Sequence, residues 1–286
     1  MRSMTKYLKP ADICADLRML RQTHKGMFVL LEGAGDFKRF KKFYSEEAIL
    51  VNCWGKDNVY GAIDIEQNSA REDVIGFVDS DFDNIHGDGE DNEDVVRSRF
   101  HDFDVDVCAT GVFARYLAEV GDPAKVEAEG GAQACVECLL QALKPLSALR
   151  YASVRNDLGY SLTKLDHAEF FDGHVIDVSA MIDHVSYGKF SSQEHKDGLR
   201  ARIDQYLAPD FDLWQFTNGH DLIAALGIAL RGRFGNRHRV LTNRSEVEKH
   251  LRLAFDVADF QHTGHLAAIR NWEQTRAVTL LLAHVN

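Results

Sequence analysis

The chain has 286 residues, of which 45% are hydrophobic, and a formal net charge of −11. This length allows a substantial core in one large or two modest domains. No apolar run approaches the roughly 18 residues that a membrane helix needs. The first ten residues lack the apolar core of a signal peptide. We therefore expect a cytoplasmic protein that makes no use of a membrane, and the five scattered cysteines suit reduced thiols better than a disulfide framework.

The first half of the chain alternates between helical and extended patterns. An amphipathic helix is expected at 11–24. The segments that follow are, in order, strand 27–32, helix 36–46, strand 48–54, helix 58–70, strand 73–79, a loop rich in Asp and Gly at 80–94, strand 95–100 and a helix from about 104. This alternation is typical of a parallel α/β sheet flanked by helices.

The second half has mostly helical periodicity. Helices are expected at 132–149, 193–207, 220–231, 244–256 and 264–284, with short strands at 151–154 and 174–178. Gly and Pro residues between 121 and 131 break the pattern. We therefore expect a first domain at 1–125 and a mainly helical extension at 126–286, which either completes the first domain or contacts nucleic acid or a partner.

Two apolar strands of the expected sheet end in carboxylates. Glu32 follows the first of them, and Asp79, Asp81 and Asp83 follow the other. Ligands of open α/β sheets bind at the carboxyl ends of the strands. If the second strand continues far enough, alternation places its three acids on one side. Mg²⁺ or Mn²⁺ prefers such oxygen ligands, so these residues are a candidate metal site; the alternative is a solvated acidic turn that ends the strand.

The negative charge is concentrated in one segment. Residues 79–106 contain eleven acidic and two basic residues, which accounts for most of the net charge. An acidic protein repels nucleic acid unless a metal ion or a local basic patch overrides its field. The best phosphate-binding candidates are Arg231, Arg233, Arg237 and Arg239. Phe234 and His238 would stack on bases; the alternative is a solvated basic loop.

Three segments together resemble a known family. They are Leu31-Glu-Gly-x-x-Asp36, Gly55-Lys-Asp-Asn58 and Val78-Asp-Ser-Asp-Phe-Asp83. The chain resembles the Toprim fold and, more narrowly, the Toprim-like DUF4435 family, whose relatives include the overcoming-lysogenization-defect (OLD) nucleases and effectors of anti-phage defence systems. The acidic stretch 100–106, followed by a helical pattern at 109–120, is also similar to that family. The resemblance covers residues 27 to about 122.

The resemblance implies a Toprim-like parallel sheet with a mostly helical C-terminal half, and a metal-binding core at 1–125. Glu32 matches the Toprim glutamate, which coordinates metal or acts as a general acid or base, and Asp36 matches the acid that follows it. Asp79 and Asp81 match the metal-binding pair, while Asp83 matches a third acid found in topoisomerases and primases.

Basic groups complete the catalytic set that we expect. OLD-type nucleases use a lysine from later in the chain, for which Lys164 is one candidate. In the segment where that lysine is expected, this chain has His220. From the residues alone, Lys56 would lie near a phosphate at a helix N-terminus, although the simpler interpretation is a turn and helix cap.

The expected function is therefore a Mg²⁺-dependent endonuclease that hydrolyses DNA or RNA. The resemblance further implies an antiviral effector controlled by an ABC-type or AAA-type ATPase partner, and a homodimer is a second expected assembly. A non-catalytic Toprim-like module that binds nucleic acid or a partner is the main alternative. A primase or topoisomerase is disfavoured, because the chain is short and has no evident zinc ribbon or winged helix.

Overall fold

The computed structural model describes residues 8–87, 89, 91–187, 191–282 and 285. The chain forms two compact units. Unit 1 comprises Met1–Ser80, Asp88–Phe103 and Phe255–Asn286, and unit 2 comprises Asp81–Gly87 and Asp104–Ala254. The chain therefore leaves unit 1 twice and returns to it both times. The expected boundary near residue 125 falls within unit 2, in α7 (Pro123–Ala128).

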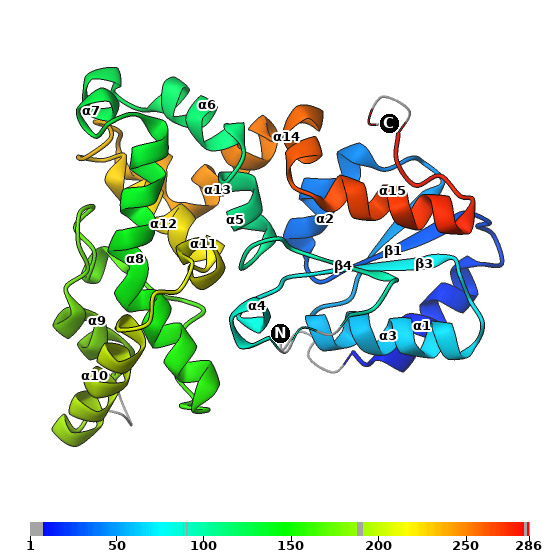
Figure 1. The fold of residues 1–286 in the computed structure, drawn as a ribbon, viewed down its shortest axis with the longest axis horizontal. Coiled ribbons are helices and arrows are strands. Elements are labelled where there is room, and N and C mark those ends of the chain that lie inside the picture. Colours follow the sequence, from blue (N-terminus) through cyan, green and yellow to red (C-terminus); the bar gives the residue numbers. More distant parts are fainter. Residues whose placement is uncertain (1–7, 88, 90, 188–190, 283–284, 286) are drawn as a thin grey trace. The chain divides into compact units, whose positions relative to one another are not determined.

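Unit 1 is built on a four-stranded parallel sheet. Its strands are β1 (Met27–Leu31), β2 (Ala48–Asn52), β3 (Val74–Val78) and β4 (Val95–Arg97), in the order β2-β1-β3-β4 (Figure 1). All residues of β1 and β3 are buried, as the continuous apolar runs of parallel strands predict. The expected parallel α/β sheet with flanking helices is confirmed.

Helices cover both faces of this sheet (Figure 1). The first face carries α1 (Pro10–Leu20) and α3 (Lys56–Asn68), and the other carries α2 (Ala34–Phe40) and α15 (His265–Arg276). The 3₁₀ turn η2 (Lys41–Phe43) continues α2, and α14 (Val257–His262) precedes α15. These C-terminal helices belong to the core of unit 1.

Particular contacts join the C-terminal helices to the sheet layer. The rings of Phe43 and Phe260 stack with their centroids 4.5 Å apart. The indole Nε1–H of Trp272 donates to Asp94 Oδ1 at 2.7 Å, just before β4. Because Asp94 is buried, this hydrogen bond satisfies an acceptor that would otherwise be costly to remove from water.

Unit 2 is helical in all its described elements. The central helix α8 (Ala132–Arg155) packs against α6 (Gly111–Val120), α10 (Gln193–Leu207), α11 (Leu213–Phe216) and α12 (Gly219–Ala229). The other elements are α4 (Asp83–His86), α5 (Phe103–Cys108), α9 (Val178–Val185), α13 (Arg244–Ala254), η3 (His167–Glu169) and η4 (Arg239–Thr242). Within the described residues, no helix combines the length and hydropathy that crossing a bilayer requires.

Two expected strands of the second half are wrong. Residues 151–154 lie in the last turns of α8, where Tyr151 and Ala152 are buried among neighbouring helices. Segment 174–178 contributes only an isolated antiparallel bridge between Phe171 and Ile176. Both segments are short and rich in residues that favour strands, so tertiary packing decides between the two structures.

Candidate functional site

The carboxyl edge of the sheet places acidic residues from neighbouring strands together. Glu32 follows β1 directly, and Asp79 follows β3, its neighbour in the sheet. The backbone N–H of Asp79 donates to Glu32 Oε2 at 3.1 Å. Two acids that are 47 positions apart in the sequence are therefore adjacent in unit 1, as expected from the parallel order of the strands.

A third acid, Asp36, lies in the first turn of α2. Its Oδ2 accepts the backbone N–H of Gly33 at 3.1 Å, which caps the helix. Its Oδ1 forms an ion pair with Arg39 Nη1 at 2.5 Å, and both residues are buried. Asp36 is thus a helix cap with a cationic partner, held close to the end of β1.

Asp102 is a fourth acid, which the sequence analysis did not select as a site residue. It lies in the loop between β4 and α5 and is 7% exposed. The residue after it, Phe103, donates its backbone N–H to Asp79 Oδ1 at 3.1 Å. The signal that could have found Asp102 is its position after a strand at the carboxyl edge, although four loop residues separate it from β4, whereas Glu32 follows β1 directly.

The three other acids raise the pKa of Asp79. Burial raises the pKa of Asp79 well above its usual range, and the negative charges of Asp102, Asp36 and Glu32 raise it further. The amide of Phe103 favours the ionised form but is outweighed. Asp79 therefore carries negative charge at a large energetic cost unless a proton or a cation compensates it.

The donor set suits a hard cation, although the described residues do not form a complete cage. No group of three or more His, Cys, Asp or Glu side chains is arranged to hold a metal ion in the described part of the chain. Mg²⁺ commonly takes one or two protein carboxylates and completes its shell with waters and substrate phosphate. Glu32, Asp79 and Asp102 are the residues whose oxygens would hold such an ion.

Asp81 and Asp83 do not continue the strand as the sequence analysis assumed. β3 ends at Val78, Asp81 has a left-handed backbone with φ of 50°, and Asp83 begins α4. The alternation that would project Asp79, Asp81 and Asp83 to one side is therefore wrong. The contacts of Asp81 and Asp83 place them in unit 2 rather than in the sheet of unit 1.

Lys56 lies at the same edge of unit 1 as Asp79. It is the first residue of α3, and Gly55 before it has φ of 136°, a conformation that glycine adopts readily. Its Nζ donates to the carbonyl oxygen of Ser80 at 3.5 Å, one residue after Asp79. The predicted position of Lys56 at a helix N-terminus is confirmed, and its ammonium group brings positive charge towards the acidic edge.

Trp54 is a second residue that the sequence analysis missed. It is 52% exposed and has φ of 59°, which is rare and strained for an aromatic residue. The next residue, Gly55, donates its backbone N–H to the carbonyl oxygen of Glu32 at 3.0 Å. The backbone next to Trp54 is thus hydrogen-bonded to the first acid of the site, although nothing in the sequence marks the backbone conformation of Trp54.

The expected arginine cluster of unit 2 divides into two kinds of arginine. Arg233 forms two hydrogen bonds with Glu129, each 2.8 Å long. Arg237 donates to the carbonyl oxygens of Glu119 and Val120 at the end of α6. Both therefore have structural partners.

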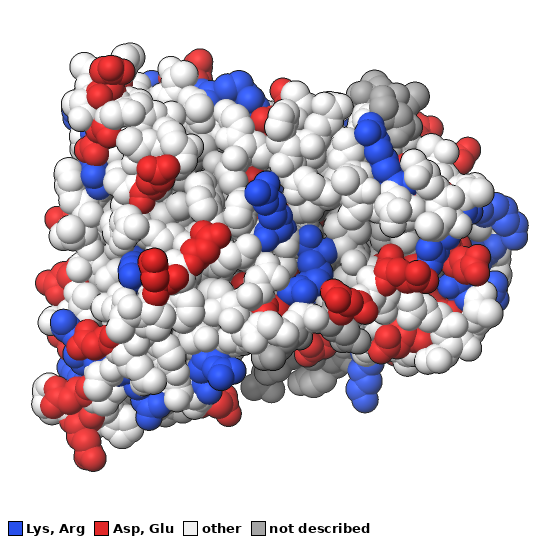
Figure 2. Space-filling view, viewed as in Figure 1, with Lys and Arg blue, Asp and Glu red and all other residues white. Residues whose placement is uncertain are grey.

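Arg231 and Arg239 line a cavity together with Lys164, and neither forms a bidentate ion pair like that of Arg233 among the described contacts. Phe234 is fully buried, so its expected stacking on a base is wrong, whereas His238 is exposed and caps η4. His220 is also in unit 2, 3.5 Å from Asp104. In the view of Figure 2, basic and acidic side chains are interspersed on each unit.

Comparison with protein-family models and with curated proteins finds no match for this chain.

Proposed function

We propose that this chain is a Mg²⁺- or Mn²⁺-dependent nuclease of the Toprim type, which hydrolyses phosphodiester bonds of DNA or RNA. The observation that carries the proposal is that Glu32 and Asp79 meet at the carboxyl edge of the sheet, where the backbone N–H of Asp79 donates to Glu32 Oε2 at 3.1 Å. Burial and the charges of Asp102, Asp36 and Glu32 raise the pKa of Asp79, which fits such a site. Four acids at the carboxyl edge of a parallel sheet are costly for stability, and a divalent cation would remove that cost. The resemblance of the motifs around Glu32 and Asp79 to the Toprim fold supports the same assignment.

The residues of the acidic site and its neighbours have separate roles in this proposal. Glu32, Asp79 and Asp102 would supply oxygen ligands to the metal ion. Alternatively, Glu32 acts as a general acid or base. A bound Mg²⁺ would polarise the phosphate and lower the pKa of the attacking water. Lys56 offsets the negative charge that develops on the phosphate. Trp54 offers a flat surface on which a base stacks.

A non-catalytic Toprim-like module is the second candidate. The observation that favours it is that the described residues contain no ready-made group of three ligands. Such a module would bind nucleic acid or a partner, and its binding would survive the loss of Asp79. The two candidates therefore differ in the effect of substituting Asp79, which would abolish cleavage by the nuclease but would not abolish binding by the module.

The regulatory part of the proposal depends on the resemblance alone. It assigns the nuclease to anti-phage defence, with an ABC-type or AAA-type ATPase as the controlling partner. Cleavage should therefore be measured with and without any ATPase encoded beside this chain. Control by that ATPase predicts that ATP changes the rate of cleavage only when the partner is present.

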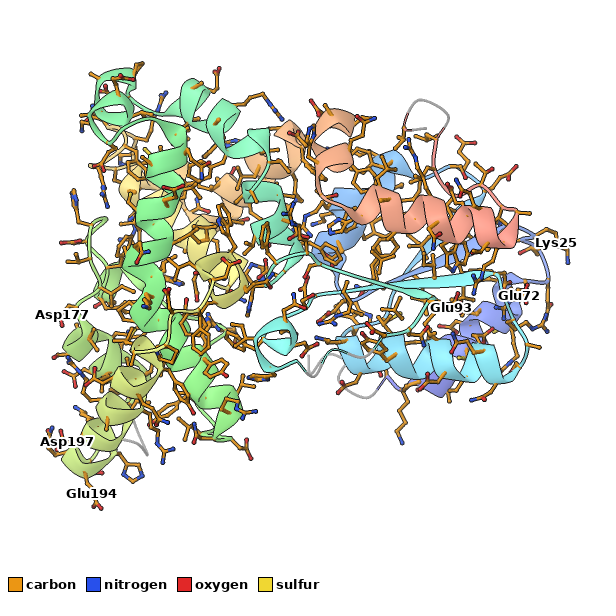
Figure 3. The ribbon with its side chains drawn as sticks, in the orientation of Figure 1. Lys25, Glu72, Glu93, Asp177, Glu194 and Asp197 are labelled. Atoms are coloured by element: carbon orange, nitrogen blue, oxygen red, sulfur yellow. The ribbon has the colours of Figure 1, made fainter. Side chains whose placement is uncertain are left out.

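The experiment is a cleavage assay on labelled single-stranded DNA, double-stranded DNA and RNA with Mg²⁺ or Mn²⁺. Glu32→Gln and Asp79→Asn should each lower the rate at least 100-fold, because electrostatic groups at a reacting centre contribute about this much. Glu72→Gln is the matched control. Glu72 is an exposed acid before β3, and Figure 3 shows it at the end of unit 1 where the strands begin.

Three outcomes separate the candidates. Loss of cleavage in both site variants, with activity retained by the control, supports the nuclease. Binding without cleavage in every protein, including those supplied with the ATPase, supports the non-catalytic module. Cleavage that is unchanged by Glu32→Gln and Asp79→Asn would refute the assignment of the site.

A further inference from the structure

Unit 2 contains a cavity of about 380 Å³ that the acidic site does not use. Segment 163–168, helix α12, the residue Arg231 and the start of α13 line it. Gly227 in α12 makes this assembly compact, because a Cβ there would lie 2.2 Å from the carbonyl oxygen of Thr242. Only glycine permits η4 to approach α12 this closely, so the arrangement of the cavity is built into the backbone.

The lining of the cavity is strongly basic. Four of the described lining residues are cationic and one is acidic; they are Lys164, Arg231, Arg239, Arg244 and Asp166. The single acid, Asp166, neutralises little of this charge. Its Oδ2 lies 3.8 Å from Arg239 Nη2, and both side chains are exposed, so water screens the pair. In a chain whose net charge is −11, this concentration of positive charge is a local exception.

The guanidinium group of Arg231 is held in place by the protein. Its Nε donates to Thr242 Oγ1 at 3.1 Å, and its Nη2 donates to the carbonyl oxygen of Thr242 at 3.4 Å. Burial lowers the pKa of Arg231, and the positive charge of Arg239 lowers it further. Two guanidinium groups thus repel each other across the cavity, and a bound anion would relieve that repulsion.

The remaining lining residues of the cavity are apolar or uncharged. Leu165, Ala168, Ala224 and Ile228 contribute aliphatic surface. His167 also lines the cavity, and its Nε2 is hydrogen-bonded to the buried Asp221 at 2.7 Å, which fixes the plane of the ring. A ligand with an anionic end and a flat, less polar end matches the basic and the apolar residues of this lining. The volume of the cavity lies in the range of small-molecule sites.

We propose that this cavity binds the terminal phosphate of a nucleotide, with the base or sugar against the α12 wall. The phosphate has two sources, a free nucleotide or the 5′ end of a nucleic-acid strand. Neither source requires the carboxylates of unit 1, so this site stands or falls independently of the nuclease assignment.

The test is calorimetric titration of the full chain in EDTA, so that no metal ion occupies the acidic site. The probes are ADP, adenosine, and a single-stranded DNA decamer with either a 5′-phosphate or a 5′-hydroxyl. The variant is Lys164→Ala combined with Arg239→Ala, two exposed side chains. The matched control is Lys196→Ala combined with Arg200→Ala, which removes the same charge from α10.

ADP should bind to the wild type and to the control, and at least tenfold more weakly to the cavity variant, while adenosine should not bind. If a strand end is the natural ligand, the 5′-phosphate decamer will bind more tightly than the 5′-hydroxyl decamer, and ADP will compete with it. If a free nucleotide is the ligand, the two decamers will not differ. Failure of both ADP and the 5′-phosphate decamer to bind, or equal weakening in the cavity and control variants, would overturn the proposal.

Discussion

Two aspartates, the half-buried Asp79 of unit 1 and the buried Asp221 of unit 2, have opposite electrostatic surroundings. Asp221 in unit 2 is 2% exposed, and its carboxylate accepts hydrogen bonds from Arg150 at 2.5 and 2.7 Å and contacts His167 at 2.7 Å. Burial raises its pKa, but the charge of Arg150 and the hydrogen bonds from His167 and Arg150 outweigh burial, so that the pKa falls to about 2. Asp79 in unit 1 has three acids near it, and its pKa rises.

Under the proposed function, this difference separates an acid that stabilises the fold from an acid that holds a cation. The fold of unit 2 places the guanidinium group of Arg150 and the ring of His167 against Asp221, so the charge of Asp221 stabilises the protein as it stands. The fold of unit 1 gathers further acids around Asp79, which lowers stability in the absence of a cation. An arrangement that costs stability is expected where binding or catalysis requires it.

The largest expected effect on stability comes from removing the carboxylate of Asp221, whose charge is compensated by Arg150. Asp221→Ala leaves the half-buried Arg150 without its carboxylate and His167 without its acceptor, which should cost about 3 kcal/mol of unfolding free energy. Chemical denaturation followed by circular dichroism measures this loss. Asp204→Ala, which removes an exposed partner of Arg200, is the control and should change stability by less than about 0.5 kcal/mol. A loss below about 1 kcal/mol for Asp221→Ala would break the comparison.

The second prediction concerns acid unfolding. The folded pKa of Asp221 is about 2, below its value in an unfolded chain, so the folded state binds this proton less readily. Its contribution is fully present above about pH 4 and is lost as the pH falls towards 2, by about 2 kcal/mol. Urea unfolding of wild type and Asp221→Asn across this range measures the contribution. Parallel pH curves for the two proteins would contradict it.

The contribution of Asp79 to stability should depend on pH in the opposite direction. Above the ordinary pKa of an aspartate, the folded state binds the proton of Asp79 more readily than the unfolded state does, so stability falls as the pH rises through the folded pKa. Asp79→Asn keeps the acceptor for the Phe103 amide and removes the charge. It should raise the unfolding free energy at pH 7 by on the order of 1 kcal/mol. A fall in thermal stability relative to wild type and Glu72→Gln would refute this.

The smallest effect on stability is expected at Trp54. Its side chain is 52% exposed and its backbone is left-handed, so Trp54→Gly relieves strain and should change stability by less than about 1 kcal/mol. Stacking of a base is worth about 1–3 kcal/mol, so affinity for single-stranded nucleic acid should fall at least fivefold. Fluorescence anisotropy measures it, with Trp54→Phe as the variant that retains an aromatic ring. Equal affinity for all three proteins would remove Trp54 from the site.

The sheet and the pairing of Glu32 with Asp79 could be predicted from the sequence. Buried parallel strands are continuous apolar runs, and the acids that follow neighbouring runs meet at one edge. Asp81 and Asp83 were placed wrongly because the strand pattern does not show where the chain turns, and the turn comes at once after Ser80. Asp102 was missed because four residues of loop separate it from the end of β4.

The two kinds of arginine in unit 2 could not be told apart from the sequence. Arg233 and Arg239 look alike in a basic segment, yet the partner of Arg233 is Glu129, 104 positions earlier in the chain. Only the packing of α7 and α8 against the segment after α12 decides which guanidinium group is already paired. Pairing of this kind depends on long-range contacts that local patterns do not contain.

The most direct test of the central claim is calorimetric titration of Mn²⁺ into the wild type, Asp79→Asn and Glu72→Gln. The account predicts that wild type and Glu72→Gln bind Mn²⁺ with equal affinity, and that Asp79→Asn binds it at least tenfold more weakly. Equal binding by all three proteins, or no binding by the wild type, would contradict the claim that the acids around Asp79 hold a divalent cation.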